Sequence, residues 1–65
     1  MPEVQVFMAE GRTDAQKKAM MLDITQALVK NLGVPSDVVT VQIVESKLTD
    51  KMKGGQTFVE RQAKK

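Results

Sequence analysis

No His or Cys occurs in the chain, so the side chains that most often carry proton transfer, nucleophilic attack and zinc binding are missing. A zinc site is therefore not expected, nor is a catalytic triad of the usual kind. The glycines form no phosphate-binding or dinucleotide-binding pattern, because the pair Gly54-Gly55 alone is too weak a signal. Acid–base chemistry has to come from a carboxylate, a lysine or the amine at the start of the chain.

Pro2 offers an unusual base. Methionine ahead of a proline is commonly removed, and loss of Met1 leaves the secondary amine of Pro2 as the N-terminus. An α-amino group has a pKa about 2.5 units below that of lysine. Partial burial or a nearby cation lowers this pKa further, toward neutrality, where a base is well suited to proton transfer at carbon. Taken alone, however, Pro2 is more often just the second residue of an ordinary protein.

Arg12 is the second candidate, because it directly precedes Thr13, the expected N-cap of a helix. A guanidinium beside unpaired helix N–H groups suits a carboxylate or phosphate. The alternative is a surface arginine paired with Glu10. Pro2 to Ala9 spans about 23 Å when extended at roughly 3.3 Å per residue, so Pro2 and Arg12 are expected at opposite ends of one strand. A small substrate that touches both must take Arg12 from a neighbouring subunit.

Two strands and a helix are expected to position these residues. Apolar and polar side chains alternate from Glu3 to Met8, which predicts a first strand. A dense run of β-branched residues from Val38 to Glu45 predicts a second strand of the buried, parallel kind. A strand, a helix and a strand in this order make a right-handed β-α-β unit with parallel strands, and the fold class is α/β.

The strongest structural signal is the helix, from about Asp14 to Leu32. Thr13 and Gln16 have the spacing of a capping box at its start, and Gly33 followed by Pro35 ends it. The apolar side of this helix is expected to consist of Met20, Ile24, Ala27, Leu28 and Leu32.

The last third of the chain is polar and rich in lysine. Ser46 to Lys53 is expected to connect the second strand to a turn at Gly54-Gly55. We expect a short hairpin that closes on Gln56 to Val59, followed by a frayed basic tail. The open edges and the uncovered face of so small a sheet predict pairing with further copies.

Length and composition bound the remaining possibilities. The 65 residues make a single domain over 1–65, and a chain of this size buries only about 60% of its unfolded surface. Without disulfides or a zinc site, self-association is the remaining source of stability. A net charge of +2 and only two aromatic residues do not favour nucleic-acid binding. No stretch approaches the roughly 18 apolar residues of a membrane span, so we expect a cytoplasmic protein with no membrane or nucleic-acid partner.

The chain resembles 4-oxalocrotonate tautomerase from end to end. The resemblance is carried by Pro2, by the run Glu10-Gly11-Arg12-Thr13-Asp14 with Gln16-Lys17, and by Pro35, Glu45 and Gly54-Gly55. It implies a β-α-β protomer with a short C-terminal hairpin that pairs into dimers, three of which form a hexamer. It also implies that the N-terminal proline moves a proton between carbons of a small enol or dienol carboxylate. Arg12 then binds a substrate carboxylate, and neither a metal nor an organic cofactor takes part.

Two positions depart from the family pattern. The family's second arginine falls at Thr40, and the aromatic residue beside the amine falls at Lys51, with Met52 next to it. Loss of the arginine removes a charge-assisted contact to the substrate. A lysine in place of the aromatic residue still disfavours a charged amine, but the apolar screen is weaker. Either Lys51, Lys47 or Lys53 replaces the missing arginine, or these lysines belong to a solvated loop.

Three interpretations of function stay open. The first is a homohexameric, cofactor-independent tautomerase for a 2-hydroxy-dienoate or a related enol acid. In the second, the chain is one subunit type of a heterohexamer, and a sister chain supplies the missing arginine and aromatic residue. In the third, the chain is an oligomeric binding protein that keeps the fold without the chemistry.

Overall fold

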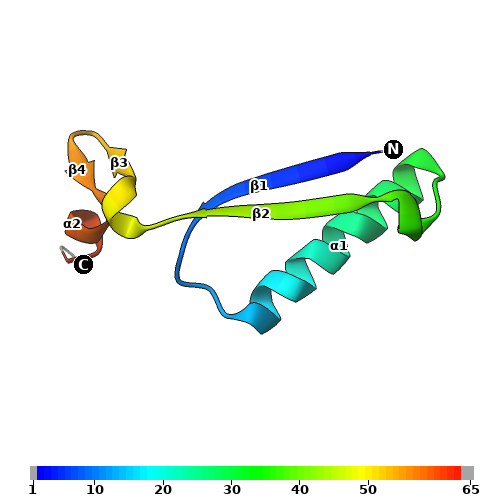
Figure 1. Cartoon of the computed structure of the whole chain (residues 1–65), viewed down its shortest axis with the longest axis horizontal. Coiled ribbons are helices and arrows are strands. Elements are labelled where there is room, and N and C mark those ends of the chain that lie inside the picture. The colour runs from blue at the N-terminus through cyan, green and yellow to red at the C-terminus, as the bar shows by residue number, and fades with distance from the viewer. Residues whose placement is uncertain (1, 64–65) are drawn as a thin grey trace.

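The computed structural model describes residues 2–63. In chain order, its helices and strands are β1 (Glu3–Ala9), α1 (Asp14–Leu32), the short 3-10 helix η1 (Ser36–Val38), β2 (Thr40–Ser46), a second 3-10 helix η2 (Leu48–Asp50), β3 (Met52–Lys53), β4 (Gln56–Thr57) and α2 (Phe58–Ala63). Figure 1 shows β1 and β2 side by side with α1 along them. The elements from η2 to α2, here called the C-terminal arm, extend beyond the end of this unit.

Strands β1 and β2 pair in parallel, in a register that runs from Glu3 opposite Thr40 to Ala9 opposite Ser46. The predicted β-α-β order with parallel strands is thereby confirmed. Along β1 the apolar residues at alternate positions from Val4 to Met8 are half-buried, whereas the residues between them are exposed. One face of the strand pair therefore packs on α1 and the other face, which carries Phe7, is open.

The predicted start of the second strand at Val38 is wrong by two residues. Ser36–Val38 form η1, in which the N–H of Val38 donates to the carbonyl of Pro35 (3.3 Å) and that of Val39 to Ser36 (3.2 Å). These N–H groups close local turns and are not available to a strand ladder. The ladder therefore begins at Thr40.

Helix α1 has the predicted bounds and the predicted signals at both ends. The Thr13 hydroxyl accepts from the Gln16 N–H (3.1 Å), and the Gln16 side chain accepts from the Thr13 N–H (3.1 Å). Gly33 ends the helix with a φ of 68°, a left-handed conformation that favours glycine. The predicted apolar side is partly wrong, since Ala27 is exposed and Leu32 is 57% exposed. The residues of α1 that are half-buried are Lys17, Met20, Met21, Ile24, Thr25, Leu28 and Val29.

The C-terminal arm contains the predicted hairpin and an element that was not predicted. Strands β3 and β4 pair antiparallel around Gly54 and Gly55, which both have positive φ. The chain then enters α2, so the expectation of an extended Val59 and a frayed tail from there on is wrong. A capping box explains the helix, because the Glu60 N–H donates to the Thr57 hydroxyl (3.2 Å) and the Thr57 N–H donates to Glu60 Oε1 (2.8 Å). The last two residues of the tail lie outside the described residues.

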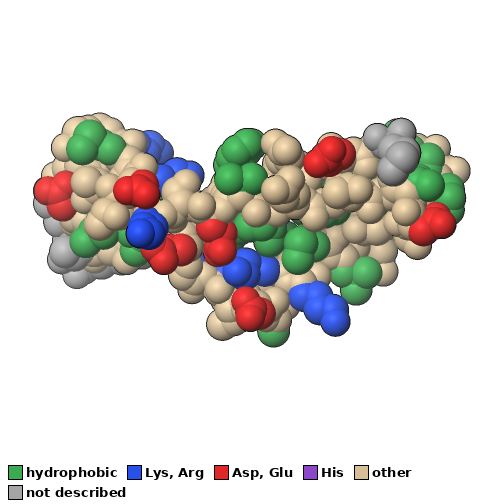
Figure 2. Space-filling view, viewed as in Figure 1, with side chains coloured by type: hydrophobic (Ala, Val, Ile, Leu, Met, Phe, Trp, Pro, Cys, Tyr) green, Lys and Arg blue, Asp and Glu red, His purple; other side chains and the backbone are tan. Residues whose placement is uncertain are grey.

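Residues 2–62 of the isolated protomer form no buried core. None of residues 2–62 is buried, and Phe7 (68%), Met52 (63%) and Leu22 (54%) are largely exposed. Figure 2 shows hydrophobic side chains at the surface over the strands and the helix. The radius of gyration is 15.1 Å, whereas a compact chain of this length has about 11 Å. A shape of this kind is expected of a protomer that completes its core with other copies.

Candidate functional site

Pro2 and Thr40 lie next to each other. Pro2 directly precedes β1 and is half-buried, and its carbonyl oxygen accepts a hydrogen bond from the Thr40 N–H (3.1 Å). Thr40 is also the register partner of Glu3, and both are exposed on the strand face that α1 does not cover. The sheet register thus brings Pro2 together with Thr40, the position at which the resemblance implies a second arginine.

Arg12 lies at the other end of β1 from Pro2. The seven residues of β1 separate them, which corresponds to about 23 Å at roughly 3.3 Å per residue. Figure 1 shows the N-terminus at one end of the strand pair and the loop into α1 at the other. One protomer therefore does not bring Pro2 and Arg12 together around a small molecule.

Arg12 is exposed and borders two hollows. The larger one, of about 490 Å³, is here called the arm hollow because it lies between the end of β1 and the C-terminal arm. Its lining residues are Met8, Ala9, Glu10, Gly11, Arg12, Leu48, Phe58 and Gln62. The smaller hollow, of about 260 Å³, is lined by Met8, Arg12, Gln16, Lys17 and Met20. Within residues 2–63 no ion pair involves Arg12, so the alternative of a pair with Glu10 is not found.

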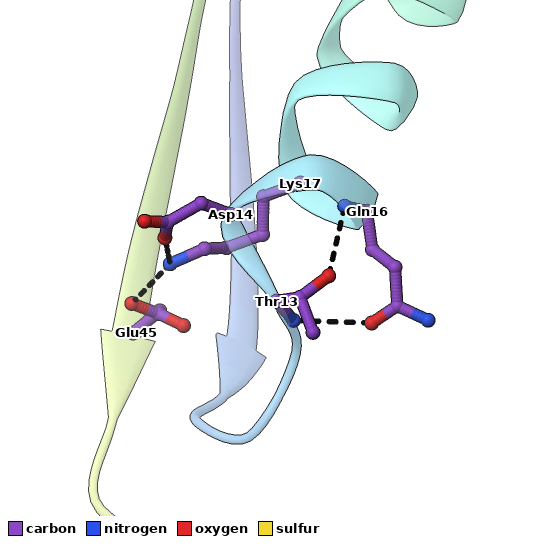
Figure 3. A network of polar contacts seen from close by, with 5 residues as sticks. All are labelled: Thr13, Asp14, Gln16, Lys17 and Glu45. Atoms are coloured by element: carbon purple, nitrogen blue, oxygen red, sulfur yellow. Dashed lines mark hydrogen bonds and ion pairs between the residues drawn. The ribbon is translucent and has the colours of Figure 1, made fainter.

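A salt-bridge network links the start of α1, which follows the loop that carries Arg12, to β2. Lys17 Nζ lies 3.1 Å from Glu45 Oε1 on β2 and 3.6 Å from Asp14 Oδ1 in the first turn of α1. The hydrogen bond to Glu45 is the main reason that the pKa of Lys17 is raised. Figure 3 shows this network beside the Thr13–Gln16 capping box. The Lys17–Glu45 contact links the first turns of α1 to β2, and the capping box fixes the backbone of Thr13, the residue after Arg12.

Lys51 lies in the C-terminal arm and contacts Phe58. Its Nζ is 5.7 Å from the centre of the Phe58 ring, within the range of a cation–π interaction. The Phe58 N–H also donates to the Lys51 carbonyl oxygen (2.9 Å). Lys47 and Lys53 are exposed. Within one protomer, Lys51 belongs with the arm hollow rather than with Pro2, because it holds one of the lining residues.

Phe58, Leu48 and Gln62 were not predicted as site residues. A signal for Phe58 was present, because it is one of only two aromatic residues and follows Thr57, which has the capping-box spacing to Glu60. Phe58 and Arg12 line the same hollow because of the path of the C-terminal arm, and no local sequence pattern predicts this path.

Acidification is expected to loosen α2 and with it Phe58. Hydrogen bonds from the Thr57 N–H and hydroxyl hold the pKa of Glu60 below its ordinary value of 4.5. A lowered pKa in the folded state stabilises above about pH 4.5, and this contribution is lost as the pH falls through the folded value. Faster amide hydrogen exchange of Phe58–Glu60 relative to α1 is the expected signal below pH 4.5. Glu60→Gln should remove this pH dependence, and an unchanged profile in that variant would contradict the assignment.

Neither a metal site nor a membrane-spanning helix is found in the part of the chain that the structure describes. Among residues 2–63, no group of three or more acidic residues is arranged to hold a metal ion. The helices in the same range are too short or too polar to cross a membrane.

Known proteins share both the sequence and the fold. The family described as "Tautomerase enzyme" matches residues 2–50. A probable tautomerase of Bradyrhizobium diazoefficiens is 70% identical over 63 residues, which cover 97% of this chain and 94% of the relative. 2-Hydroxymuconate tautomerase of Pseudomonas putida is 51% identical over 45 residues, which cover 69% of this chain and 71% of the relative.

A solved structure from a study of the 4-oxalocrotonate tautomerase isozymes of Methylibium petroleiphilum has a TM-score of 0.88 and 38% sequence identity, covering 98% of this chain and 100% of that chain. The agreement in sequence and in fold confirms the resemblance drawn from the residues alone. The chain belongs to the tautomerase family.

Proposed function

We propose that the chain is a cofactor-independent tautomerase of a small enol or dienol carboxylate, with the Pro2 amine as general base after loss of Met1. The observation that carries the proposal is the position of Pro2. It is half-buried directly before β1, and the Thr40 N–H donates a hydrogen bond to its carbonyl oxygen. A positioned amine with a pKa below that of lysine suits a base that works near neutral pH.

The reaction needs only a proton acceptor that can also return the proton. The lone pair of the Pro2 nitrogen takes the proton of the enol hydroxyl group, and the electrons of the O–H bond form the carbonyl. The carbon–carbon double bond shifts accordingly, and the same proton is delivered to a carbon of the substrate. Nothing is oxidised or reduced, so the chemistry requires no redox cofactor.

The second group of the proposed site is Arg12, which binds a substrate carboxylate and comes from a neighbouring copy. The length of β1 supports this arrangement, since Pro2 and Arg12 of one protomer lie at its opposite ends. The lack of buried side chains among residues 2–62 of the isolated protomer supports association with further copies. We propose a hexamer of such chains, either of one kind or with a sister chain.

Thr40 is expected to set a preference for substrates with a single carboxylate. Without an arginine at this position, the second carboxylate of 2-hydroxymuconate has no charged partner beside Pro2. Thr40→Arg should therefore raise kcat/KM for 2-hydroxymuconate relative to phenylenolpyruvate by about tenfold or more, because a hydrogen bond to a charged group contributes ~1.5–3 kcal/mol. Ketonisation rates of both acids, followed by absorbance, give the ratio.

Gln42→Arg is the matched control for Thr40→Arg. Gln42 is exposed and lies two residues further along β2, away from Pro2. An equal change in the ratio of the two rates in both variants would contradict a specific role for position 40. If the purified chain alone has no activity and gains it with a sister chain, the heterohexamer replaces the homohexamer in the proposal.

A further inference from the structure

The arm hollow has a charged side and an apolar side. Arg12 and Glu10 lie in the loop after β1, whereas Phe58 and Leu48 come from the C-terminal arm. Arg12 is exposed, and no ion pair within residues 2–63 involves it. Its guanidinium is therefore available to a carboxylate, which it can bind through two parallel hydrogen bonds.

Phe58 is positioned by contacts to its backbone and to its ring. Its N–H donates to the Lys51 carbonyl oxygen (2.9 Å), and Lys51 Nζ lies 5.7 Å from the ring centre. The capping box between Thr57 and Glu60 fixes the start of α2, where Phe58 is the first residue. The ring is half-buried, in contrast to the other aromatic residue, Phe7, which is 68% exposed on β1. Phe58 is thus an ordered aromatic surface beside the Arg12 loop.

We propose that Phe58 is a specificity-determining residue, the apolar wall against which the conjugated carbons of a carboxylate bound to Arg12 pack. This inference rests on the proposed function. Planar unsaturated or aryl carbons stack on an aromatic ring more favourably than saturated carbons do. Glu10 lines the same hollow and repels a second carboxylate. The substrate class is accordingly a monocarboxylic acid with an aryl or conjugated tail.

Lys51 acts here as a positioning residue. Its ammonium group lies over the Phe58 ring, at a distance typical of cation–π contacts.

Binding of a matched pair of acids to the full chain tests this inference. The pair is trans-cinnamate, which is planar and conjugated, and 3-cyclohexylpropanoate, which is saturated and of similar size. Calorimetry on the unmodified protein should give about two- to tenfold tighter binding of cinnamate, the range expected for aromatic stacking. Phe58→Leu should bring the ratio of the two Kd values close to one, and Arg12→Ala should weaken both acids. Val59→Ala, beside Phe58 but not in the hollow, should leave the ratio unchanged.

A second measurement needs no variant at the hollow. In the unmodified protein, nuclear Overhauser contacts should join the vinyl protons of cinnamate to the Phe58 ring protons. An unaltered preference for cinnamate in Phe58→Leu, a lack of binding by either acid, or the absence of these contacts would each overturn the inference.

The same titration in Pro2→Ala separates this inference from the proposed function. A preserved preference for cinnamate in that variant supports the Phe58 wall, whatever the turnover of the variant is. Turnover that does not depend on Pro2 would reject the proposed function but not the proposed role of Phe58 in binding. Turnover that depends on Pro2, together with an unaltered preference for cinnamate in Phe58→Leu, would reject only the proposed role of Phe58.

Discussion

Pro2→Ala is expected to lower kcat for the ketonisation of an enol acid by about 10²- to 10⁴-fold, the range of a positioned general base. The variant keeps an α-amino group after loss of Met1, but it is a primary amine without the ring that fixes the nitrogen relative to β1. Stopped-flow absorbance with phenylenolpyruvate measures kcat. Pro35→Ala is the matched control, because it replaces an exposed proline whose nitrogen lies in a peptide bond and cannot act as a base. Equal loss in both variants would indicate damage to the fold rather than to the base.

Arg12→Ala is expected to lower kcat/KM by about 10- to 100-fold, mainly through KM, because a hydrogen bond to a charged group contributes ~1.5–3 kcal/mol. Arg12→Lys should restore only part of the loss, since an ammonium group cannot form the two parallel bonds of a guanidinium. Lys30→Ala removes the same charge from the last turn of α1 and should leave kcat/KM unchanged. A similar loss in Lys30→Ala would show that the effect comes from the overall charge.

Mixing the two impaired variants tests whether Arg12 comes from another subunit. If Pro2 and Arg12 of one site belong to different copies, oligomers assembled from Pro2→Ala and Arg12→Ala chains contain some sites with both native residues. After the two variants are unfolded together and refolded, activity should then rise above that of either variant alone. Activity that remains at the level of the separate variants would place both residues in one copy and contradict the intersubunit site.

The elements with strong local signals were predicted with accurate bounds. The capping box of Thr13 and Gln16 and the stop at Gly33 define α1 without any tertiary information. The alternation from Glu3 to Met8 likewise predicts β1, which extends to Ala9. The start of β2 was predicted two residues too early, because β-branched residues favour extended backbone but do not reveal the turn of η1.

Features that depend on packing were predicted less well. Ala27 and Leu32 have apolar spacing on α1, yet they are exposed in the protomer, since the strand pair covers a different stripe of the helix. Helix α2 has only six residues, too few for periodicity to identify it. Its cap, formed by Thr57 and Glu60, is the one local signal it carries.

In the candidate site, too, some features were predictable from the sequence and others depend on the fold. Pro2 and Arg12 stand out by type and place in the sequence, and their separation follows from the length of one strand. The proximity of Thr40 to Pro2 comes from the parallel register of β1 and β2. The arm hollow, which Phe58 and Arg12 both line, is formed by the path of the chain after β2. Neither arrangement can be read from residue spacing, because each joins segments that are distant in the sequence.

The most direct test of the Pro2 amine as the base is the pH dependence of kcat/KM for chain that has lost Met1. It is compared with chain that carries one added glycine ahead of Pro2. The added residue turns the Pro2 nitrogen into an amide, which cannot accept a proton, and changes no other side chain. For the native N-terminus, kcat/KM should rise with pH through a single ionisation at about pH 8 or below, as expected of an α-amino group. The extended chain should be inactive at every pH. Equal rates for the two proteins, or a rate of the native chain that does not change with pH, would contradict the proline base.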